Sequence, residues 1–105
     1  MLRIYPLSLQ MIREVGPYAK KIARFDRDLS RQLLRSSSSV ALNMSEGSGS
    51  RGGNRRSRYD ISLGSAKETR TNLEVAEALN YIGSIDVALL DHLDHIIATL
   101  WKLVR

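Results

Sequence analysis

The stretch Phe25–Ser50, FDRDLSRQLLRSSSSVALNMSEGSGS, holds the pattern that decides the fold of this chain. Apolar residues recur on one helical face at Leu29, Leu33, Val40 and Met44. Four consecutive serines, Ser36–Ser39, lie among them, and such a run is often a linker. The step from Leu33 to Val40, however, is seven residues, or two helical turns. We therefore predict one helix that continues through the serines, where small side chains let another helix approach, although serine is a mediocre helix former.

Three further helical segments flank this one. Before it, an apolar stripe keeps its phase from Ile4 to Phe25 across Gly16-Pro17, which predicts one kinked helix rather than two. After it, we predict a helix over about Asn54–Ile82, then the turn IGSID, and a last helix capped by Ser84 that runs to Val104. Either Asp26 or Asp28 would cap the helix of the opening stretch. Since no strand pattern occurs and the connections are short, the expected fold is all-α. We predict an antiparallel up-down-up-down four-helix bundle that forms a single domain over residues 1–105.

The segment Asn54–Ile82 is apolar on two nearly opposite sides. One side carries Tyr59, Leu63, Ala66 and Leu73, and the other carries Ile61, Gly64, Val75, Leu79 and Ile82. Leu34, Ala41 and Leu42 also widen the apolar surface of the preceding helix. A helix that is apolar on two sides is buried on two sides. We therefore expect the second side to meet another subunit in a homo-oligomer.

Charge is distributed unevenly along the chain. Residues 1–70 hold 14 Lys and Arg against 6 Asp and Glu, whereas residues 71–105 hold 2 against 5. This asymmetry suggests either a surface for a polyanion or an oligomer that pairs the two halves. On the helix of the opening stretch, one row lies opposite the apolar face: Arg24, Arg27, Arg31 and Arg35. Such a row is also common on an ordinary solvated face.

The segment GSGSRGGNRRSR, Gly47–Arg58, is predicted to be a glycine-rich loop followed by a basic helix start. Its arginines are Arg51, Arg55, Arg56 and Arg58. Helix N-termini expose unpaired N–H groups and partial positive charge that attract phosphate, and the arginines would strengthen this attraction. The alternative is a solvated basic loop. The G-x-G-x-x-G spacing of the glycines is read as accidental, because a helix and not a strand precedes it.

No enzyme chemistry is evident in the sequence. No serine has a histidine partner nearby in sequence, and the absence of cysteine excludes disulfides and thiolate metal sites. The cluster DHLDH, Asp91–His95, lacks the second Glu-x-x-His element of metal sites in bundles, even with Glu74 and Glu77 considered. We expect no catalytic residue, no metal and no cofactor. No apolar run approaches the roughly 20 residues that span a bilayer, and no signal peptide is apparent, so a cytoplasmic location without membrane contact is expected.

Several motifs resemble those of a known family. They are SSVALNMSEG at Ser38–Gly47, LGSAKE at Leu63–Glu68, NYIG at Asn80–Gly83 and IIATLWKLV at Ile96–Val104. With these motifs the chain resembles the small four-helix-bundle family of 23S rRNA intervening-sequence proteins. The resemblance implies an antiparallel bundle that assembles into a ring of five. It also implies kinship with the accessory variability protein of diversity-generating retroelements, a basic pentameric barrel that engages a reverse transcriptase and RNA.

The resemblance supplies no catalytic residues, because the family has none that are recognised. Many members carry an aromatic residue in the first turn of the third helix, where this chain has Arg55 and Arg58. Two functional hypotheses follow. The first is a non-enzymatic homo-oligomer that binds nucleic acid, with structured RNA favoured, through Arg31, Arg35, Arg51, Arg55, Arg56 and Arg58. The second is a protein-interaction scaffold or accessory subunit for a reverse-transcriptase-like partner. Beyond Tyr59 few aromatics lie near the arginines in sequence, which favours backbone contacts over base stacking.

Overall fold

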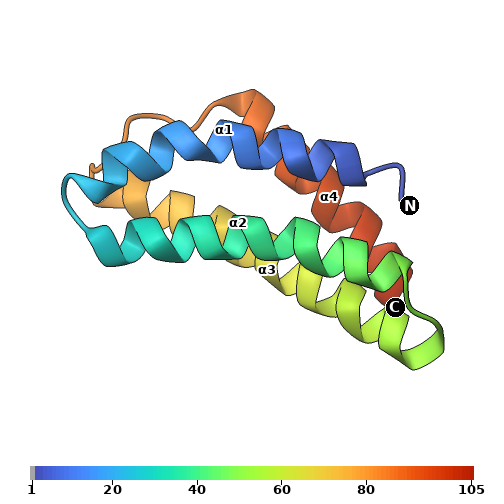
Figure 1. Cartoon of the computed structure of the whole chain (residues 1–105). Coiled ribbons are helices and arrows are strands. Elements are labelled where there is room, and N and C mark those ends of the chain that lie inside the picture. Colours follow the sequence, from blue (N-terminus) through green and yellow to red (C-terminus); the bar gives the residue numbers. More distant parts are fainter. Residues whose placement is uncertain (1) are drawn as a thin grey trace.

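The computed structural model describes residues 2–105, which form four helices and no strands. The helices are α1 (Tyr5–Ala23), α2 (Arg27–Ser48), α3 (Gly52–Ala78) and α4 (Val87–Val104). Each helix packs against the next one along the chain, and α4 returns against α1 (Figure 1). The predicted all-α four-helix bundle is confirmed.

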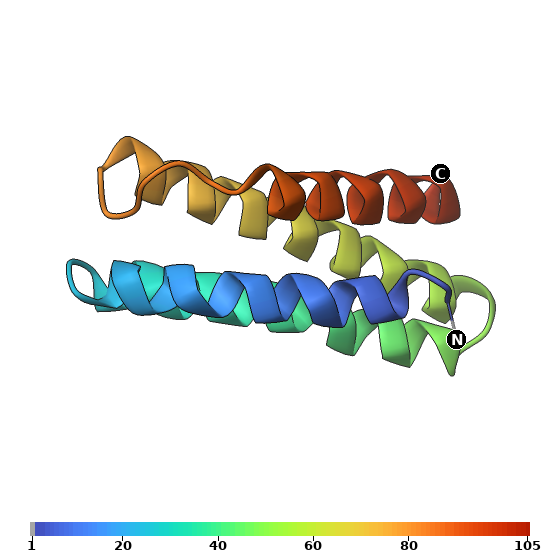
Figure 2. The same ribbon diagram turned by 90° about the horizontal axis from the view of Figure 1, so that it is seen from above.

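The two ends of the bundle differ in what they contain. The chain termini and the α2–α3 turn lie at one end, whereas the α1–α2 and α3–α4 connections lie at the other (Figures 1 and 2). The molecule measures 42 × 24 × 20 Å along its principal axes, so the two ends are far apart.

The predicted continuity of α2 through the serines is confirmed. Asp26, and not Asp28, caps the helix, because its carboxylate accepts a hydrogen bond of 3.0 Å from the backbone N–H of Leu29. Ser36 and Ser37 are buried against the other helices. Of all the helix pairs, α2 and α3 pack most extensively, which agrees with the close approach expected at small residues.

Hydroxyl groups line the contact between α2 and α3. Ser62 donates a hydrogen bond of 2.7 Å to the carbonyl oxygen of Val40. Ser36 accepts hydrogen bonds from Thr69, at 2.9 Å, and from the amide of Asn72, at 3.3 Å. Because these polar side chains are buried and satisfied, they join the two helices without the cost of an unpaired polar group.

The first helix is continuous across Pro17, as the unbroken apolar phase predicted. Val15 and Ala19, on either side of the proline, are both buried in the core. Ser30 of α2 donates a hydrogen bond of 2.7 Å to the carbonyl oxygen of Ala19. Burial on both sides of Pro17 and this contact with α2 hold the helix together where the proline removes a backbone donor.

Some helix boundaries differ from the predictions. The third helix ends at Ala78 rather than at Ile82, because Asn80 adopts a left-handed conformation with φ of 61° that ends the helix. Asp86, and not Ser84, caps α4 by accepting a hydrogen bond from the N–H of Ala88. Ile82 and Ile85 nevertheless stay buried, so their apolar spacing reflected a turn packed on the core rather than helix.

The two apolar sides of α3 have different environments. The side that carries Tyr59, Leu63, Ala66 and Leu73 belongs to the core. Ile61, Val75 and Leu79 on the other side are exposed in the single chain. The core is therefore complete without the second side of α3, where Ile61, Val75 and Leu79 form an exposed, largely apolar ridge that the exposed Glu68 interrupts.

Candidate nucleic-acid interface

A tight turn between α2 and α3 forms the end of the molecule where the sequence placed a basic site. Only Gly49, Ser50 and Arg51 separate the two helices, so the turn is shorter than the loop over Gly47–Asn54 that the glycines suggested. Gly52 adopts a φ of +57°, a conformation that a side chain would disfavour. The hairpin of α2 and α3 projects beyond the ends of α1 and α4 (Figure 1).

Gly47 and Tyr59 close the core just behind this turn. Tyr59 is only 5% exposed, and a Cβ atom on Gly47 would lie 2.4 Å from the Cε1 atom of the tyrosine ring. Gly47 is thus a point of close helix approach and not a loop glycine. The core ends at Tyr59, since every residue from Arg51 to Arg58 is exposed.

Arg55 is a structural residue as well as a charged one. Its Nε–H donates to the carbonyl oxygens of Ser50, at 2.9 Å, and of Gly47, at 3.3 Å. Gly47 lies in the last turn of α2, where the helix dipole is negative, and Ser50 lies in the turn just after it. A positive side chain at the start of α3 is therefore tolerated because the end of α2 lies beside it. Sequence reasoning missed this role, since the partner helix end becomes adjacent only in the folded hairpin.

Arg58 also contacts α2. It forms a salt bridge of 3.0 Å with Glu46 and donates a hydrogen bond of 3.3 Å to Asn43. Both members of the ion pair are about half exposed. An exposed pair of this kind contributes only ~0–1 kcal/mol to stability. Its larger effect is to offset part of the positive charge of Arg58 at this end of the molecule.

Arg51 and Arg56 differ from the other two arginines of the turn. Both are exposed, and neither forms a salt bridge or a side-chain hydrogen bond with any residue from 2 to 105. Arg51 precedes α3 without capping it through its side chain. These two guanidinium groups are accordingly available to an external anion.

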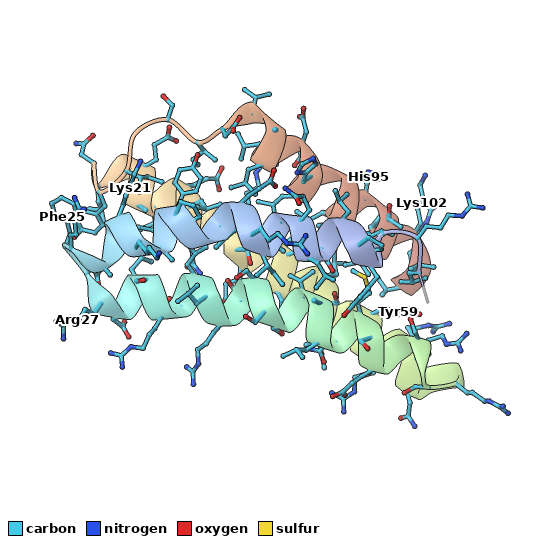
Figure 3. The ribbon with its side chains drawn as sticks, turned by 45° about the horizontal axis from the view of Figure 1, so that its top comes forward. Lys21, Phe25, Arg27, Tyr59, His95 and Lys102 are labelled. Carbon is cyan, nitrogen blue, oxygen red and sulfur yellow. The ribbon has the colours of Figure 1, made fainter. Side chains whose placement is uncertain are left out.

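Arg31 and Arg35 lie away from the turn. Both are exposed on the outer side of α2, in the predicted arginine row, of which Arg27 is labelled in Figure 3 and Arg24 lies before α2. Eleven residues separate Arg35 from Glu46, which corresponds to about 16 Å along the helix axis. The structure thus brings Arg51, Arg55, Arg56 and Arg58 together and places Arg31 and Arg35 on a separate stretch of surface.

The bundle topology adds cations that sequence reasoning did not include. Arg3 precedes α1, and Lys102 and Arg105 lie at the end of α4; all three are exposed. Both termini share the end of the α2–α3 turn, and Lys102 and Tyr59 lie at this end in Figure 3. We call the set Arg3, Arg51, Arg55, Arg56, Arg58, Lys102 and Arg105 the basic end. Arg3, Lys102 and Arg105 are far from the α2–α3 turn in sequence, so no local pattern linked them to it. Only the antiparallel order of the helices brings them to the same end.

Two residues of the DHLDH cluster contact other helices. Asp94 forms a salt bridge with Arg70 of α3. The Nδ1–H of His92 donates a hydrogen bond of 2.7 Å to the carboxylate of Glu14 on α1, and His95 is exposed. Across residues 2–105, no group of three or more histidine and acidic residues is arranged to hold a metal ion.

Over the same residues, every helix is too short or too polar to cross a membrane.

Comparison with known proteins bears on the fold and the family. Comparison with curated proteins returned no match. A crystal structure of a protein of unknown function from the S23 ribosomal protein family of Bacteroides thetaiotaomicron superposes with a TM-score of 0.83. The two are 23% identical over 97% of this chain and 98% of that chain, which shows a shared fold. Residues 1–102 match the family described as 23S rRNA-intervening sequence protein, so this chain belongs to that family.

Proposed function

We propose that this protein is a non-enzymatic nucleic-acid-binding protein that holds the phosphate backbone of structured RNA at its basic end. The observation that carries the proposal is the pair Arg51 and Arg56. Both are exposed and without a carboxylate partner in residues 2–105, and both lie beside the N-terminus of α3 on a projecting hairpin. A net charge of +5 for the whole chain agrees with a polyanionic ligand.

Local features of the turn favour phosphate in particular. The first turn of α3 contains Gly52 and Gly53, which have no side chains to keep a ligand from the backbone N–H groups. Backbone N–H groups at a helix N-terminus bind anions, and the guanidinium groups of Arg51 and Arg56 add two charge-assisted donors. Such contacts read the backbone and not the bases, so we expect little dependence on nucleotide sequence.

We further propose that the protein acts as a homo-oligomer. The exposed ridge of α3, formed by Ile61, Val75 and Leu79, is apolar, and an apolar groove that includes Leu9 and Leu42 lies between α1 and α2. A ridge on one subunit that fits a groove on the next is a heterologous contact, which closes into a ring when the rotation allows. The number five comes from the resemblance described above. Kinship with the accessory variability protein, and a reverse-transcriptase partner, stay predictions.

The proposal can be tested by measuring RNA affinity as a function of salt. Fluorescence anisotropy with labelled RNA hairpins of unrelated sequence should give steep salt dependence for the parent. The Arg51→Ala/Arg56→Ala variant should flatten the log–log slope by about 0.7 to 0.9 for each phosphate that it no longer neutralises. Arg55 and Arg58 are left in place because they contact α2. A matched Arg31→Ala/Arg35→Ala variant removes the same charge away from the turn and should weaken binding less.

Two results would overturn the proposal. In the first, the two double variants weaken binding equally, which would indicate attraction by net charge alone. In the second, the parent shows no salt-sensitive binding to RNA. The unpaired arginines would then be assigned to an acidic protein partner, as in the scaffold hypothesis. Circular dichroism at the assay salt should show unchanged helix content in both variants.

A further inference from the structure

We propose that Phe25 is a stacking platform for an unpaired base of RNA, at the opposite end of the bundle from the basic end. Phe25 lies in the connection between α1 and α2 and is 62% exposed. Its ring stacks on that of Tyr81, with ring centroids 5.0 Å apart and planes only 4° from parallel. Tyr81 is partly buried and packs against the core on the inner side. The outer face of Phe25 is therefore open to a third planar group.

Backbone hydrogen bonds fix the main chain that carries both rings. The N–H groups of Phe25 and of Asp26 both donate to the carbonyl oxygen of Ile22, at 2.9 and 2.8 Å. On the other connection, the N–H of Tyr81 donates to the carbonyl oxygen of Ala76 at 2.9 Å, and Asn80 adopts its left-handed conformation. The stacked pair is thus formed before any ligand arrives, which reduces the entropy that binding would cost.

Four cationic residues lie close to Phe25 along the chain. Lys20, Lys21, Arg24 and Arg27 lie on the same connection and its flanking turns, and all four are exposed. Figure 3 shows Lys21, Phe25 and Arg27 together at this end. No salt bridge engages any of the four within residues 2–105. Lys20 and Lys21 also complement the C-terminal dipole of α1, a role that leaves their ammonium groups at the surface.

Three carboxylates near this end accept hydrogen bonds from neutral N–H groups of their own helices and keep their negative charge. Asp26 accepts a hydrogen bond from the N–H of Leu29, and Asp28 accepts one from the amide of Gln32. Asp86, at the start of α4, accepts one from the N–H of Ala88. Glu77, in the last turn of α3, is a fourth carboxylate at this end. Within residues 2–105, none of the four forms a salt bridge with Lys20, Lys21, Arg24 or Arg27.

An open aromatic face with cations beside it fits a nucleotide. The base stacks on the ring, and the lysines and arginines contact the flanking phosphates. Every base has a π-face, so the site would accept any unpaired nucleotide. A duplex cannot use it, because its bases are already stacked on one another. This site goes beyond the proposed function, which concerns phosphates at the other end and requires no unpaired base.

The test distinguishes binding through the Phe25 ring from binding through the neighbouring cations. The probes are a labelled single-stranded oligouridylate, an abasic sugar-phosphate oligomer of the same length, and an RNA duplex, all measured by fluorescence anisotropy at fixed salt. Phe25→Ala should weaken oligouridylate binding about 5- to 150-fold, the range measured when a stacking aromatic is replaced by alanine. Binding of the abasic oligomer and of the duplex should not change. Phe25→Tyr should restore binding, whereas Phe25→Leu, which is apolar without a π-face, should not.

Val87→Ala supplies the matched protein control. Val87 is 69% exposed at the start of α4, so its replacement also removes apolar surface without disturbing the core. This variant should bind oligouridylate as the parent does. The proposal is overturned if Phe25→Leu binds oligouridylate as tightly as Phe25→Tyr, or if Phe25→Ala weakens the abasic oligomer equally. It is also overturned if light scattering shows that Phe25→Ala lowers the oligomer mass, since the ring is then a subunit contact.

Failure of this proposal and failure of the proposed function give different results. If Phe25→Ala loses oligouridylate binding and the parent shows no salt-sensitive duplex binding, the stacking site is supported and the phosphate site at the basic end is contradicted. If duplex binding depends on Arg51 and Arg56 and replacing Phe25 has no effect, the phosphate site at the basic end is supported and the stacking site is contradicted.

Discussion

At the scale of single residues, Gly47 determines how closely α2 can approach α3. Its position in the sequence suggested a flexible loop, but it lies inside α2 and faces the ring of Tyr59. A hydrogen atom in place of a side chain lets the ring fill this space. The same tyrosine places its hydroxyl oxygen 3.4 Å from that of Ser48, so the ring is fixed on two sides.

Gly47→Ala is expected to destabilise the protein by about 1–3 kcal/mol. The added Cβ atom would overlap the buried ring of Tyr59, and this strain exceeds the ~1 kcal/mol that alanine gains over glycine in a helix. Urea unfolding followed by circular dichroism measures the effect. Gly53→Ala is the control, because Gly53 lies in α3 and nothing lies within 4 Å of its added Cβ; its stability should equal that of the parent or exceed it by up to about 1 kcal/mol. Equal stabilities for the two variants would contradict the assigned packing.

At the scale of the elements, α2 and α3 are joined by buried hydroxyl groups as well as by apolar side chains. Ser36 is the centre of this contact, since its hydroxyl oxygen accepts from Thr69 and Asn72. The serine run in α2 therefore serves two purposes. It lets the helices approach, and it provides acceptors for the polar side chains of α3.

Ser36→Ala should lower the free energy of unfolding by about 1–3 kcal/mol. Thr69 keeps the carbonyl oxygen of Ser65 as an acceptor, whereas the buried amide of Asn72 loses its partner. Ser38→Ala is a matched control in the same run, because Ser38 is partly exposed and makes no side-chain hydrogen bond with residues 2–105. Its effect should stay within about 0.5 kcal/mol. Thermal unfolding of the two variants side by side would decide between a specific contact and a general cost of alanine.

The helices could be predicted more fully than their ends or their polar contacts. The seven-residue step from Leu33 to Val40 was enough to predict helix through the serines, because apolar periodicity is a local property. The same periodicity wrongly extended the helices to Ile82 and Ile85, since a buried turn also places apolar residues inward. The contact of Arg55 with the carbonyls of Gly47 and Ser50 depends on how the chain reverses. No local pattern encodes it.

The candidate site was predictable in part for the same reason. The arginines Arg51 to Arg58 are adjacent in sequence, so their clustering needed no fold. Arg3, Lys102 and Arg105 join them only because an up-down-up-down bundle brings both termini to the α2–α3 turn. Phe25 and Tyr81 are likewise paired by two connections that are distant in sequence.

At the scale of the whole molecule, the apolar ridge of α3 has no partner in the single chain. Ile61, Val75 and Leu79 face away from the core, and exposed apolar patches commonly mark contacts with other proteins. The ridge begins beside the basic end, so subunits joined through it would carry their basic ends in a repeated arrangement. A multivalent surface of this kind would bind extended RNA more tightly than one subunit alone.

Ile61→Gln combined with Val75→Gln should lower the mass of the particle without unfolding it. Both side chains are exposed, so the core is unchanged, while two side chains that we propose to contact a neighbouring subunit become amides. Light scattering at micromolar concentration should find a multimer of the 11.8 kDa chain for the parent and smaller species for the variant. Lys67→Gln, an exposed polar position on the same helix, should leave the mass unchanged. If the parent protein is monomeric, the proposed assembly is wrong.

The pairing of α2 with α3 has a consequence for the order of folding. These helices are neighbours in sequence and form the most extensive contact, so closing the short turn between them costs little chain entropy. The contact of α1 with α4 is smaller and joins the two ends of the chain. We therefore expect the α2–α3 hairpin to be formed in the transition state and α4 to dock late. Replacements within the hairpin would then slow folding, whereas a Leu93→Ala replacement in α4 would chiefly speed unfolding.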